Sequence, residues 1–437
     1  MLGGCLQFTA FTTFWAISTK IIDLGGMNTW TVLILLSLCS IVQFLGSSSV
    51  TGQVFATAVR NFPAQKGRVV GLIKGWVGLC GGMYTQIFIG FVPVDLDDQQ
   101  DPLWLYFCLV AAICCISATF VPSQFIEVHD APAVTGSGAF EANVQRRVHF
   151  GYGILLCMGV TVVGSALLEH VVSRAVLTGF AVLIIIIWAS PLILAWEGLD
   201  VEEVGGGNKG GIVLDVPLIG EEVGGTKLVS VSLTISEMVR TLDFWLFLWP
   251  CLVLIGGGIG LTTNIAQMFG SIYSSGNVVA MTFFSATQSL SRVGAGGLCD
   301  VLRRRGLSGA IVVLGGLVFM LVGYVCFVMN TETYLFVGVV FCGVGFGSAW
   351  PVMVVVVAEL FGEAHLGGNY MVYDGVASAV GALLFGKFIP EEIYDAHTEE
   401  GETDCYGKEC FQLTYWIVVG LVLSAMVSIA ILIKRIH

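Results

Sequence analysis

Long apolar stretches recur along the whole chain, and they constrain its fold more than any other feature. A helix of about twenty apolar residues is long enough to cross the hydrocarbon core of a bilayer. The chain has twelve such candidate spans bounded by polar breaks, at 2–21, 29–59, 69–93, 103–125, 150–168, 175–196, 242–269, 277–299, 310–329, 333–358, 368–390 and 412–433. The sequence therefore predicts an all-α membrane protein, a polytopic bundle of about twelve transmembrane helices.

Composition excludes a soluble protein. Hydrophobic residues make up 56% of the chain and charged residues 11%, whereas a soluble domain carries about 25% charged residues. The net charge of −12 comes from acids gathered in connecting segments, which indicates solvated loops. The sequence has no basic stripe of the kind that would indicate a nucleic-acid partner. We therefore expect the lipid bilayer, and no nucleic acid, as a partner.

A polar segment divides the spans into two groups of six. Residues 197–241 are rich in Gly and Glu, with runs such as GGGNKGG and IGEEVGG. This composition is typical of a flexible linker. We expect an N-terminal membrane half at 1–196, a cytosolic linker at 197–241 and a C-terminal six-helix half at 242–437.

Lys and Arg residues in the connecting segments and near the ends of the spans predict the orientation. With Met1 in the cytosol, four of them lie on the external side of the membrane: Lys20, Arg174, Lys387 and Lys408. Thirteen lie on the cytosolic side: Arg60, Lys66, Arg68, Arg146, Arg147, Lys209, Lys227, Arg240, Arg303, Arg304, Arg305, Lys434 and Arg435. Both termini are therefore expected in the cytosol. We expect the plasma membrane, with an internal membrane as the alternative.

Two cations fall inside the spans, where an unpaired charge is costly and often functional. Lys74 lies near the cytosolic end of its span, so its ammonium can either snorkel to the interface or bind substrate. Arg292 lies within an apolar span and is the first residue of a motif, RVGAGGLCDVLRRRG, that also contains Gly296, Asp300, Arg303 and Arg304. That motif resembles the conserved loop of the major facilitator superfamily, and a simple positive-inside loop is the alternative interpretation.

Residues 59–88, VRNFPAQKGRVVGLIKGWVGLCGGMYTQIF, resemble the signature of the nodulin-like branch of that superfamily. The resemblance rests on RNFP at 60–63, VVGxxKGxxGL at 69–79 and the Thr85–Gln86 pair, while Cys80 and Gly82 depart from the usual Ser and Ala. It continues in GVGFGSAWP at 343–351, AELFG at 358–362 and the Cys-x4-Cys-Phe segment at 405–411. It implies a conformational role for Arg60, Asn61, Pro63 and Gly71.

The resemblance also implies an arrangement of the spans. Two family helices normally precede the segment that starts here at Leu2, so we expect an N-terminally truncated member. The spans at 150–168 and 175–196 then correspond to an extra helix pair. Where the family has Tyr-Asn-Phe-Gly, this chain has Tyr373, Asp374 and Gly375.

Other polar residues inside the spans are candidates for a substrate pathway: Gln86, Asn264, Gln267, Gln288, Trp350 and Asp374. Asn264 and Gln267 are three residues apart and so share a helix face, where they either hold helices together or line a cavity. Asp374 is either a proton-coupling carboxylate or a residue at a helix end facing the cytosol. Trp350, beside Pro351, belongs either to a gate or to the packing.

The function expected from these residues and from the resemblance is secondary active transport. The solute is a small organic anion, a metabolite or a metal-linked substrate, moved by alternating access and coupled to a proton. A non-transporting membrane sensor or scaffold of the same fold is the alternative. Histidines are scattered, so we expect no enzyme, cofactor or metal site. Cys405 and Cys410, expected outside, form either a disulfide or two free thiols.

Overall fold

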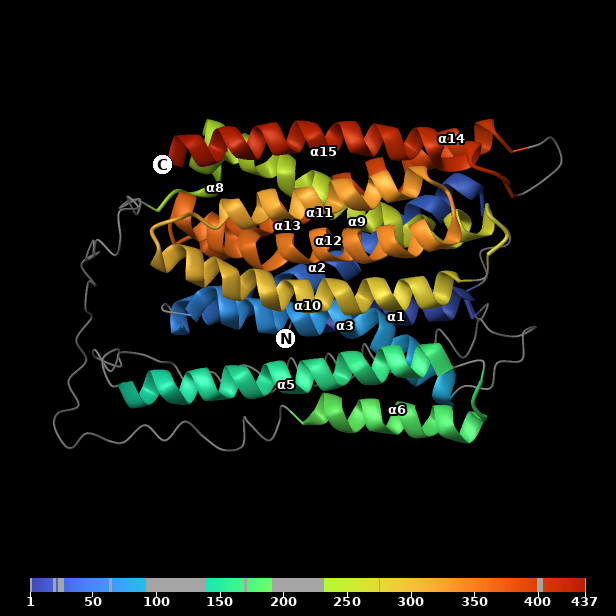
Figure 1. Ribbon diagram of the computed structural model, residues 1–437, viewed down its shortest axis with the longest axis horizontal. Coiled ribbons are helices and arrows are strands. Elements are labelled where there is room, and N and C mark those ends of the chain that lie inside the picture. The colour runs from blue at the N-terminus through green and yellow to red at the C-terminus, as the bar shows by residue number, and fades with distance from the viewer. Residues whose placement is uncertain are drawn as a thin grey trace.

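The computed structural model describes residues 2–18, 21–22, 27–62, 65–91, 138–168, 171–190, 232–274, 276–398 and 404–436, and within these ranges every regular element is a helix. The expected span at 103–125 lies outside the described residues. Long helices run side by side along the longest axis of the molecule (Figure 1). The fold is thus an all-α membrane bundle, as the sequence predicts.

The N-terminal half contributes five described helices. They are α1 (Leu2–Ser18), α2 (Thr29–Asn61), α3 (Lys66–Phe91), α5 (Gly138–Leu168) and α6 (Arg174–Ala189). In the C-terminal half the helices are α8 (Ile235–Met238), α9 (Leu242–Gly270), α10 (Asn277–Arg304), α11 (Ala310–Val328), α12 (Glu332–Phe361), α13 (Leu366–Gly381), the π-helix η3 (Ala382–Phe388), α14 (Ile389–Ala396) and α15 (Glu409–Ile436).

Six of the described helices are both long and apolar enough to cross a membrane: Gln145–Leu168, Leu242–Gly270, Ala310–Val328, Glu332–Phe361, Leu366–Ala396 and Glu409–Ile436. The helices α3 and α10 have sufficient length but are more polar, with Lys74 in α3 and Gln288 and Arg292 in α10. These polar side chains are buried against other helices. A polar face that meets protein does not meet lipid, so burial makes such helices compatible with a bilayer.

The core of the C-terminal half surrounds α9 and α12. In each of these two helices, 78% of an apolar 18-residue stretch is buried inside the protein, whereas the corresponding share in α15 is 33%. Side chains of α15 such as Trp416 and Val427 are exposed on the outer surface, as expected for residues that face lipid. Two helices enclosed by the others thus form the centre of this half, and α15 lies at its periphery.

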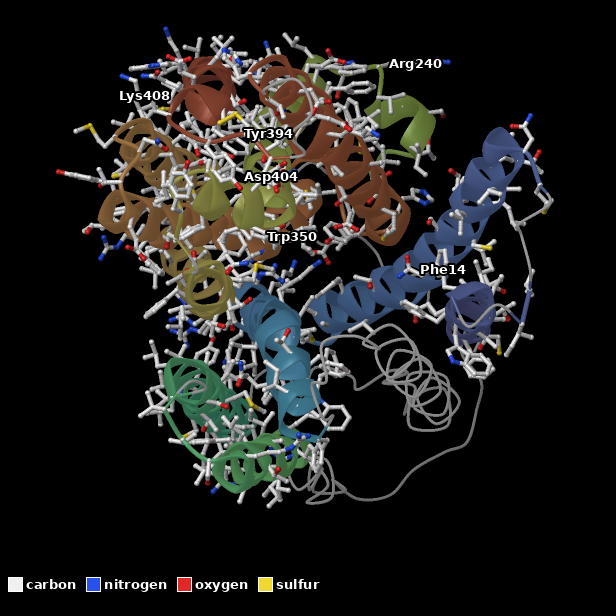
Figure 2. The ribbon with its side chains drawn as sticks, turned by 90° about the vertical axis from the view of Figure 1, so that its right-hand side faces the viewer. Phe14, Arg240, Trp350, Tyr394, Asp404 and Lys408 are labelled. Carbon is white, nitrogen blue, oxygen red and sulfur yellow. A yellow bond between two sulfur atoms is a disulfide. The ribbon has the colours of Figure 1, made fainter. Side chains whose placement is uncertain are left out.

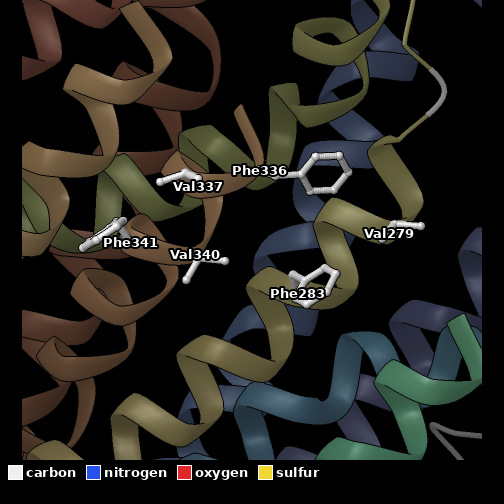
Figure 3. A pocket seen from close by; sticks show the side chains of 6 residues that line it. All are labelled: Val279, Phe283, Phe336, Val337, Val340 and Phe341. Atoms are coloured by element: carbon white, nitrogen blue, oxygen red, sulfur yellow. The ribbon is translucent and has the colours of Figure 1, made fainter. Parts of the chain in front are cut away.

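An apolar groove is lined by side chains of α10 and α12 (Figure 3). It has a volume of about 510 Å³ and is lined by Val279, Phe283, Phe336, Val337, Val340 and Phe341. Because all six side chains are apolar, we assign this groove to the lipid-facing surface.

The two halves meet where α3 crosses α10. Glycines of α3 face α10, and a Cβ atom placed on Gly71 would lie 2.8 Å from the backbone oxygen of Arg292. A Cβ placed on Gly78 would lie 3.0 Å from the Cα atom of Ser289. Small residues allow the two backbones to approach closely, so Ser289 Oγ reaches the carbonyl oxygen of Gly75 at 2.7 Å.

Helices α5 and α6 pack together on another side of α3 (Figure 1). Their contact with α3 is mainly apolar and includes Leu79, Leu155 and Ile184. Thr178 donates a hydrogen bond to the carbonyl oxygen of Gly90 at 2.7 Å. These helices cover most of the spans predicted at 150–168 and 175–196, although α5 begins earlier in the chain and residues 191–196 lie outside the described residues.

Part of the expected linker, residues 232–241, is described and packs on the C-terminal half. The Leu233 amide donates to the carbonyl oxygen of Phe361 at 2.9 Å, and Asn369 Nδ2 donates to the carbonyl oxygen of Leu233 at 2.9 Å. Thr234 and Glu237 form a capping box at the start of α8. These contacts attach the segment that precedes α9 to α12 and α13.

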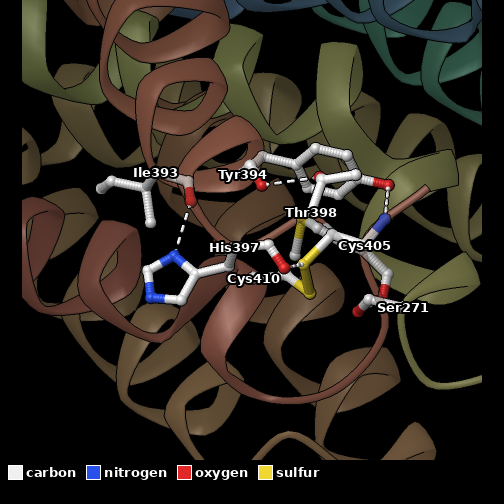
Figure 4. Close-up of a disulfide and its surroundings, with 8 residues drawn as sticks. Ser271, Ile393, Tyr394, His397, Thr398, Cys405 and Cys410 are labelled. Atoms are coloured by element: carbon white, nitrogen blue, oxygen red, sulfur yellow. Dashed lines mark hydrogen bonds between the residues drawn. A yellow bond between two sulfur atoms is a disulfide. The ribbon is translucent and has the colours of Figure 1, made fainter. Parts of the chain in front are cut away.

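At the opposite end of the bundle, Cys405 and Cys410 are joined by a disulfide (Figure 4). The Cys405 amide donates to the Tyr394 hydroxyl at 2.9 Å, and the Gly407 amide donates to the carbonyl oxygen of Ser271 at 2.8 Å. Gly407 has a φ of 106°, which favours glycine. The disulfide loop is therefore attached both to α14 and to the C-terminal end of α9.

Candidate functional site

Six side chains from five helices meet around the two intramembrane cations. Figure 2 places Trp350 on the side of the C-terminal helices that faces α3. We call this set the cation cage; its members are Phe55 on α2, Lys74 on α3, Arg292 on α10, Trp350 on α12, and Tyr370 and Asp374 on α13. The cage therefore combines residues from both sequence halves.

Lys74 lies under three aromatic rings. Its Nζ atom is 4.5 Å from the centre of the Phe55 ring, 4.4 Å from Trp350 and 5.3 Å from Tyr370. The side chain is buried, with 3% of its surface exposed. Lys74 is eight residues from Lys66, the first residue of α3, or about 12 Å along the helix axis. The ammonium therefore does not snorkel to the interface.

Arg292 is held by polar groups of both halves. Its Nη1 donates to the carbonyl oxygen of Lys74 at 2.9 Å, and its Nη2 donates to Gln288 Oε1 at 2.7 Å. The guanidinium carbon lies 5.8 Å from the Phe346 ring and 5.4 Å from the Trp350 ring. Stacking on aromatic rings suits the planar, weakly hydrated guanidinium, which is thereby fixed beside Lys74.

One carboxylate offsets these two positive charges. Asp374 interacts electrostatically with both Lys74 and Arg292, and its Oδ1 accepts a hydrogen bond from the Tyr370 hydroxyl at 3.0 Å. Asp374 is buried within α13 and does not lie at a helix end. With all three groups ionised, the cage carries a net charge of +1.

Two N–H donors of the cage remain unused. Among the residues that the structure describes, Arg292 Nε and Trp350 Nε1 are buried and have no hydrogen-bond partner. Buried donors without partners are uncommon, and each costs about 1–3 kcal/mol. The cage thus presents positive charge and free donors at the same place.

Three other predicted pathway residues lie outside the cage. Asn264 is buried and donates from Nδ2 to the carbonyl oxygens of Gly260 at 2.8 Å and Gly386 at 3.2 Å. It therefore connects α9 to the π-helix η3, whereas Gln267 is exposed. Gln86 accepts a hydrogen bond from Ser165 Oγ at 2.6 Å, between α3 and α5.

Two residues of the predicted loop motif, Asp300 and Arg303, belong to a second cluster. We call this cluster the charged end; its members are Lys66, Asp300, Arg303, Glu359 and Glu363. Asp300 accepts hydrogen bonds from the backbone amides of Gly67 and Arg68, each at 2.9 Å. A carboxylate at these first amides of α3 also interacts favourably with the helix dipole. Asp300 thus links α10 to the start of α3, and it also interacts electrostatically with Arg303 of the arginine triplet.

The arginines that follow Asp300 have different surroundings. Arg303 forms an ion pair with Glu359 at 3.3 Å, while Arg304 is exposed. Lys66 forms an ion pair with Glu363. Gly67 and Gly296 lie at the closest approach of α3 and α10, with Gly71 beside them, next to this cluster. The side chains of Arg60 and Asn61, and all of Pro63, lie outside the described residues.

Sequence reasoning identified the cations, Trp350 and Asp374 but missed the rings of Phe55, Phe346 and Tyr370. Aromatic residues are common in apolar spans, so their positions alone carried no signal. It also missed the ion-pair partners Glu359 and Glu363, although both are acids near the predicted inside end of a span. Within the described ranges, no three His, Cys, Asp or Glu side chains are grouped as metal ligands.

Comparison with known proteins agrees with the sequence resemblance. Residues 1–196 match the family described as Nodulin-like, which confirms that resemblance over the N-terminal half. The "Probable transporter MCH1" of Yarrowia lipolytica is 26% identical over 211 residues, which span 44% of this chain and 42% of that protein. The match therefore covers less than half the length of that curated relative.

Among solved structures, a crystal structure of the major facilitator superfamily transporter FucP in the outward conformation aligns with 100% of this chain and 99% of its own. The identity is 10% and the TM-score 0.37. A likeness at this level supports no argument about mechanism or substrate.

Proposed function

We propose that this chain, whose first 196 residues match the nodulin-like family, is a secondary active transporter of the major facilitator type. The cation cage is its substrate site. The observation that supports this proposal is the burial of Lys74 and Arg292 together, at 3% and 4% exposure, between the two halves of the chain. Such a position is typical of substrate sites in transporters built from two helix bundles.

A purely structural role does not account for two buried cations. Removing a charged group from water costs several kcal/mol. A cation–π contact returns about 2 kcal/mol when desolvated, and Asp374 is a single counter-charge. An apolar interface would join α3 and α10 at lower cost, so the cations favour a functional site.

The contacts around the cage suggest how access alternates. At the charged end, Asp300 caps α3, and ion pairs join Lys66 to Glu363 and Arg303 to Glu359. Together with the close approach of Gly71 and Gly296, these contacts close the cage on that side. Opening that side requires α3 and α10 to separate, which breaks the Asp300 cap.

The proposed solute is small and is an organic anion, a metabolite or a metal-linked substrate, coupled to a proton through Asp374. We assign both termini and the charged end to the cytosol, in agreement with the Lys and Arg distribution. The plasma membrane is the proposed location. The alternative function is a sensor that binds the same solute without moving it.

Uptake by proteoliposomes tests the proposal. The full chain is screened against pools of carboxylates, amino acids and metal ions, with and without a pH gradient. We expect uptake from at least one pool and its loss in Lys74→Met, while the exposed-residue control Lys434→Met transports normally. Absence of uptake from every pool rejects the transporter proposal. Equal uptake by Lys74→Met and Lys434→Met would show that the cation cage is not the substrate site.

A further inference from the structure

We infer that the cation cage recognises one monovalent carboxylate, which is held by three donors: Arg292 Nε, Trp350 Nε1 and Lys74 Nζ. This inference rests on the proposed function for its location and adds the chemical class of the substrate. Three observations support it, namely the unused donors, the net charge and the nature of the walls.

The unused donors are the first observation. Arg292 is 4% exposed, and its Nε atom has no partner among the described residues, although Nη1 and Nη2 are both occupied. Trp350 Nε1 is also buried without a partner within that part of the chain. The Lys74 ammonium lies against aromatic faces and adds further N–H groups. A carboxylate has two oxygens with about four lone-pair sites and can accept from all three donors.

The described acceptors near these donors each take part in one hydrogen bond. Gln288 Oε1 and the carbonyl oxygen of Lys74 both accept from Arg292, and Asp374 Oδ1 accepts from Tyr370. Arg292 Nε and Trp350 Nε1 are buried and have no partner among the described residues, so the site favours a ligand that accepts hydrogen bonds.

The charge balance favours a single negative charge. Asp374 interacts electrostatically with both Lys74 and Arg292, and when all three groups are ionised their charges sum to +1, which a monovalent anion neutralises. In that state a dicarboxylate would leave a buried net charge of −1, and its second carboxylate would be repelled by Asp374. Like charges in a buried site are strongly unfavourable.

The walls specify the remainder of the ligand. Phe55, Trp350, Tyr370 and Phe346 contribute aromatic rings around the two cations. Rings of this kind favour an apolar body behind the carboxylate. Chloride would satisfy the charge but has no apolar body to pack against the rings, so carboxylates should bind more tightly than chloride.

Direct binding tests this inference independently of flux. The full-length protein in nanodiscs of uncharged lipid is titrated with acetate, propionate and benzoate, and with succinate, glucose and chloride at equal ionic strength. Binding is measured by isothermal calorimetry and by the rise in unfolding temperature that a bound ligand produces. We expect at least one monocarboxylate to bind, and to bind tighter than all three comparison solutes. No binding by any monocarboxylate, or equal binding by succinate, glucose or chloride, overturns the inference.

Two substitutions test the donors. Trp350→Phe keeps an aromatic ring but removes the N–H group. Arg292→Lys keeps the positive charge but removes Nε together with the two hydrogen bonds that Nη1 and Nη2 make. Losing one hydrogen bond to a charged group should weaken monocarboxylate binding about tenfold or more. Trp249→Phe is the matched control, because Trp249 Nε1 donates to Ser424 Oγ at 3.0 Å, away from the cage. Unchanged affinity in both cage variants contradicts the donor assignment.

Failures of the two proposals give different results. Carboxylate binding that depends on Arg292 and Trp350, without uptake in proteoliposomes, retains this inference and supports a sensor. Uptake of a solute other than a monocarboxylate, without monocarboxylate binding, retains the transporter and rejects this inference. If Trp350→Phe does not fold, two measurements still test the inference. They are the order of affinities of the native protein for the different solutes, and the monocarboxylate affinity of Arg292→Lys.

Discussion

Arg292 donates a hydrogen bond from Nη1 to the carbonyl oxygen of Lys74 at 2.9 Å, so one buried cation is anchored to the backbone of the other. The bond joins α10 to α3 across the two halves of the chain. It depends on the close crossing of these helices, where Gly71 and Gly75 face α10. The proposed substrate site therefore lies at the interface between the two halves of the chain.

Lys74→Met should make the protein more stable while it abolishes uptake. Desolvation of the ammonium costs several kcal/mol, whereas its cation–π contacts return about 2 kcal/mol. Methionine has a similar length and fills the space between the rings. We expect the free energy of unfolding to rise by about 1 kcal/mol, measured as an increase in the unfolding midpoint of the purified protein. A clear fall in the midpoint would instead assign Lys74 a structural role.

Asp374→Asn should uncouple transport from protons. The Tyr370 hydroxyl can still donate to the amide oxygen, so folding is retained. The variant cannot gain or lose a proton at this position, and uptake should no longer respond to an imposed pH gradient. Initial rates are compared with and without the gradient, and Asp395→Asn, an exposed carboxylate, serves as the control. A full response in Asp374→Asn would assign proton coupling to another group.

Gly296→Ala should weaken the crossing of α3 and α10. A Cβ at Gly296 would overlap the backbone of Gly67, and the backbone cannot move away as a flexible side chain can. Overpacking of this kind costs about 1–3 kcal/mol. Gly294→Ala on the same helix has nothing within 4 Å of the new atom. This control should be neutral or slightly stabilising through helix propensity. Thermal unfolding of both variants measures the difference, and equal midpoints would contradict the close contact.

Asp300→Ala should destabilise the charged end. The substitution removes two hydrogen bonds to the first amides of α3, each made by a charged acceptor. Loss of a helix cap costs about 0.5–2 kcal/mol, and we expect a value near 2 kcal/mol here. Hydrogen exchange at the start of α3 should accelerate, while exchange in α15 stays unchanged. Protection equal to that of the native protein would show that this cap is not needed.

Removal of the disulfide should loosen the opposite end of the bundle. Cys405 and Cys410 are separated by 5 residues, and closing so short a loop contributes about 2 kcal/mol in the chain-entropy model. The double substitution Cys405→Ser/Cys410→Ser should lower the unfolding midpoint. Cys157→Ser, which alters an exposed free cysteine, should not. A reducing agent should mimic the double substitution in the native protein only.

Periodicity and residue type predicted much of the fold and part of the site. Apolar runs located the described spans, because lipid requires long helices whose backbone groups bond to each other. The cost of an intramembrane charge singled out Lys74 and Arg292 without any structure. The interruption at η3 was missed, since a π-helix between Gly381 and Ile389 depends on how Phe385 packs against glycines of α9.

The sequence by itself determined that this chain is a helical membrane protein with two intramembrane cations and a nodulin-like N-terminal half. Hydropathy, charge placement and local motifs are properties of neighbouring residues, and they remain visible in one dimension. Only the tertiary structure decided that Lys74 and Arg292 meet, that Phe55, Trp350 and Tyr370 enclose the ammonium, and that Asp300 caps a helix more than two hundred residues away. These relationships depend on the close packing of α3 against α10, which glycines on both helices permit.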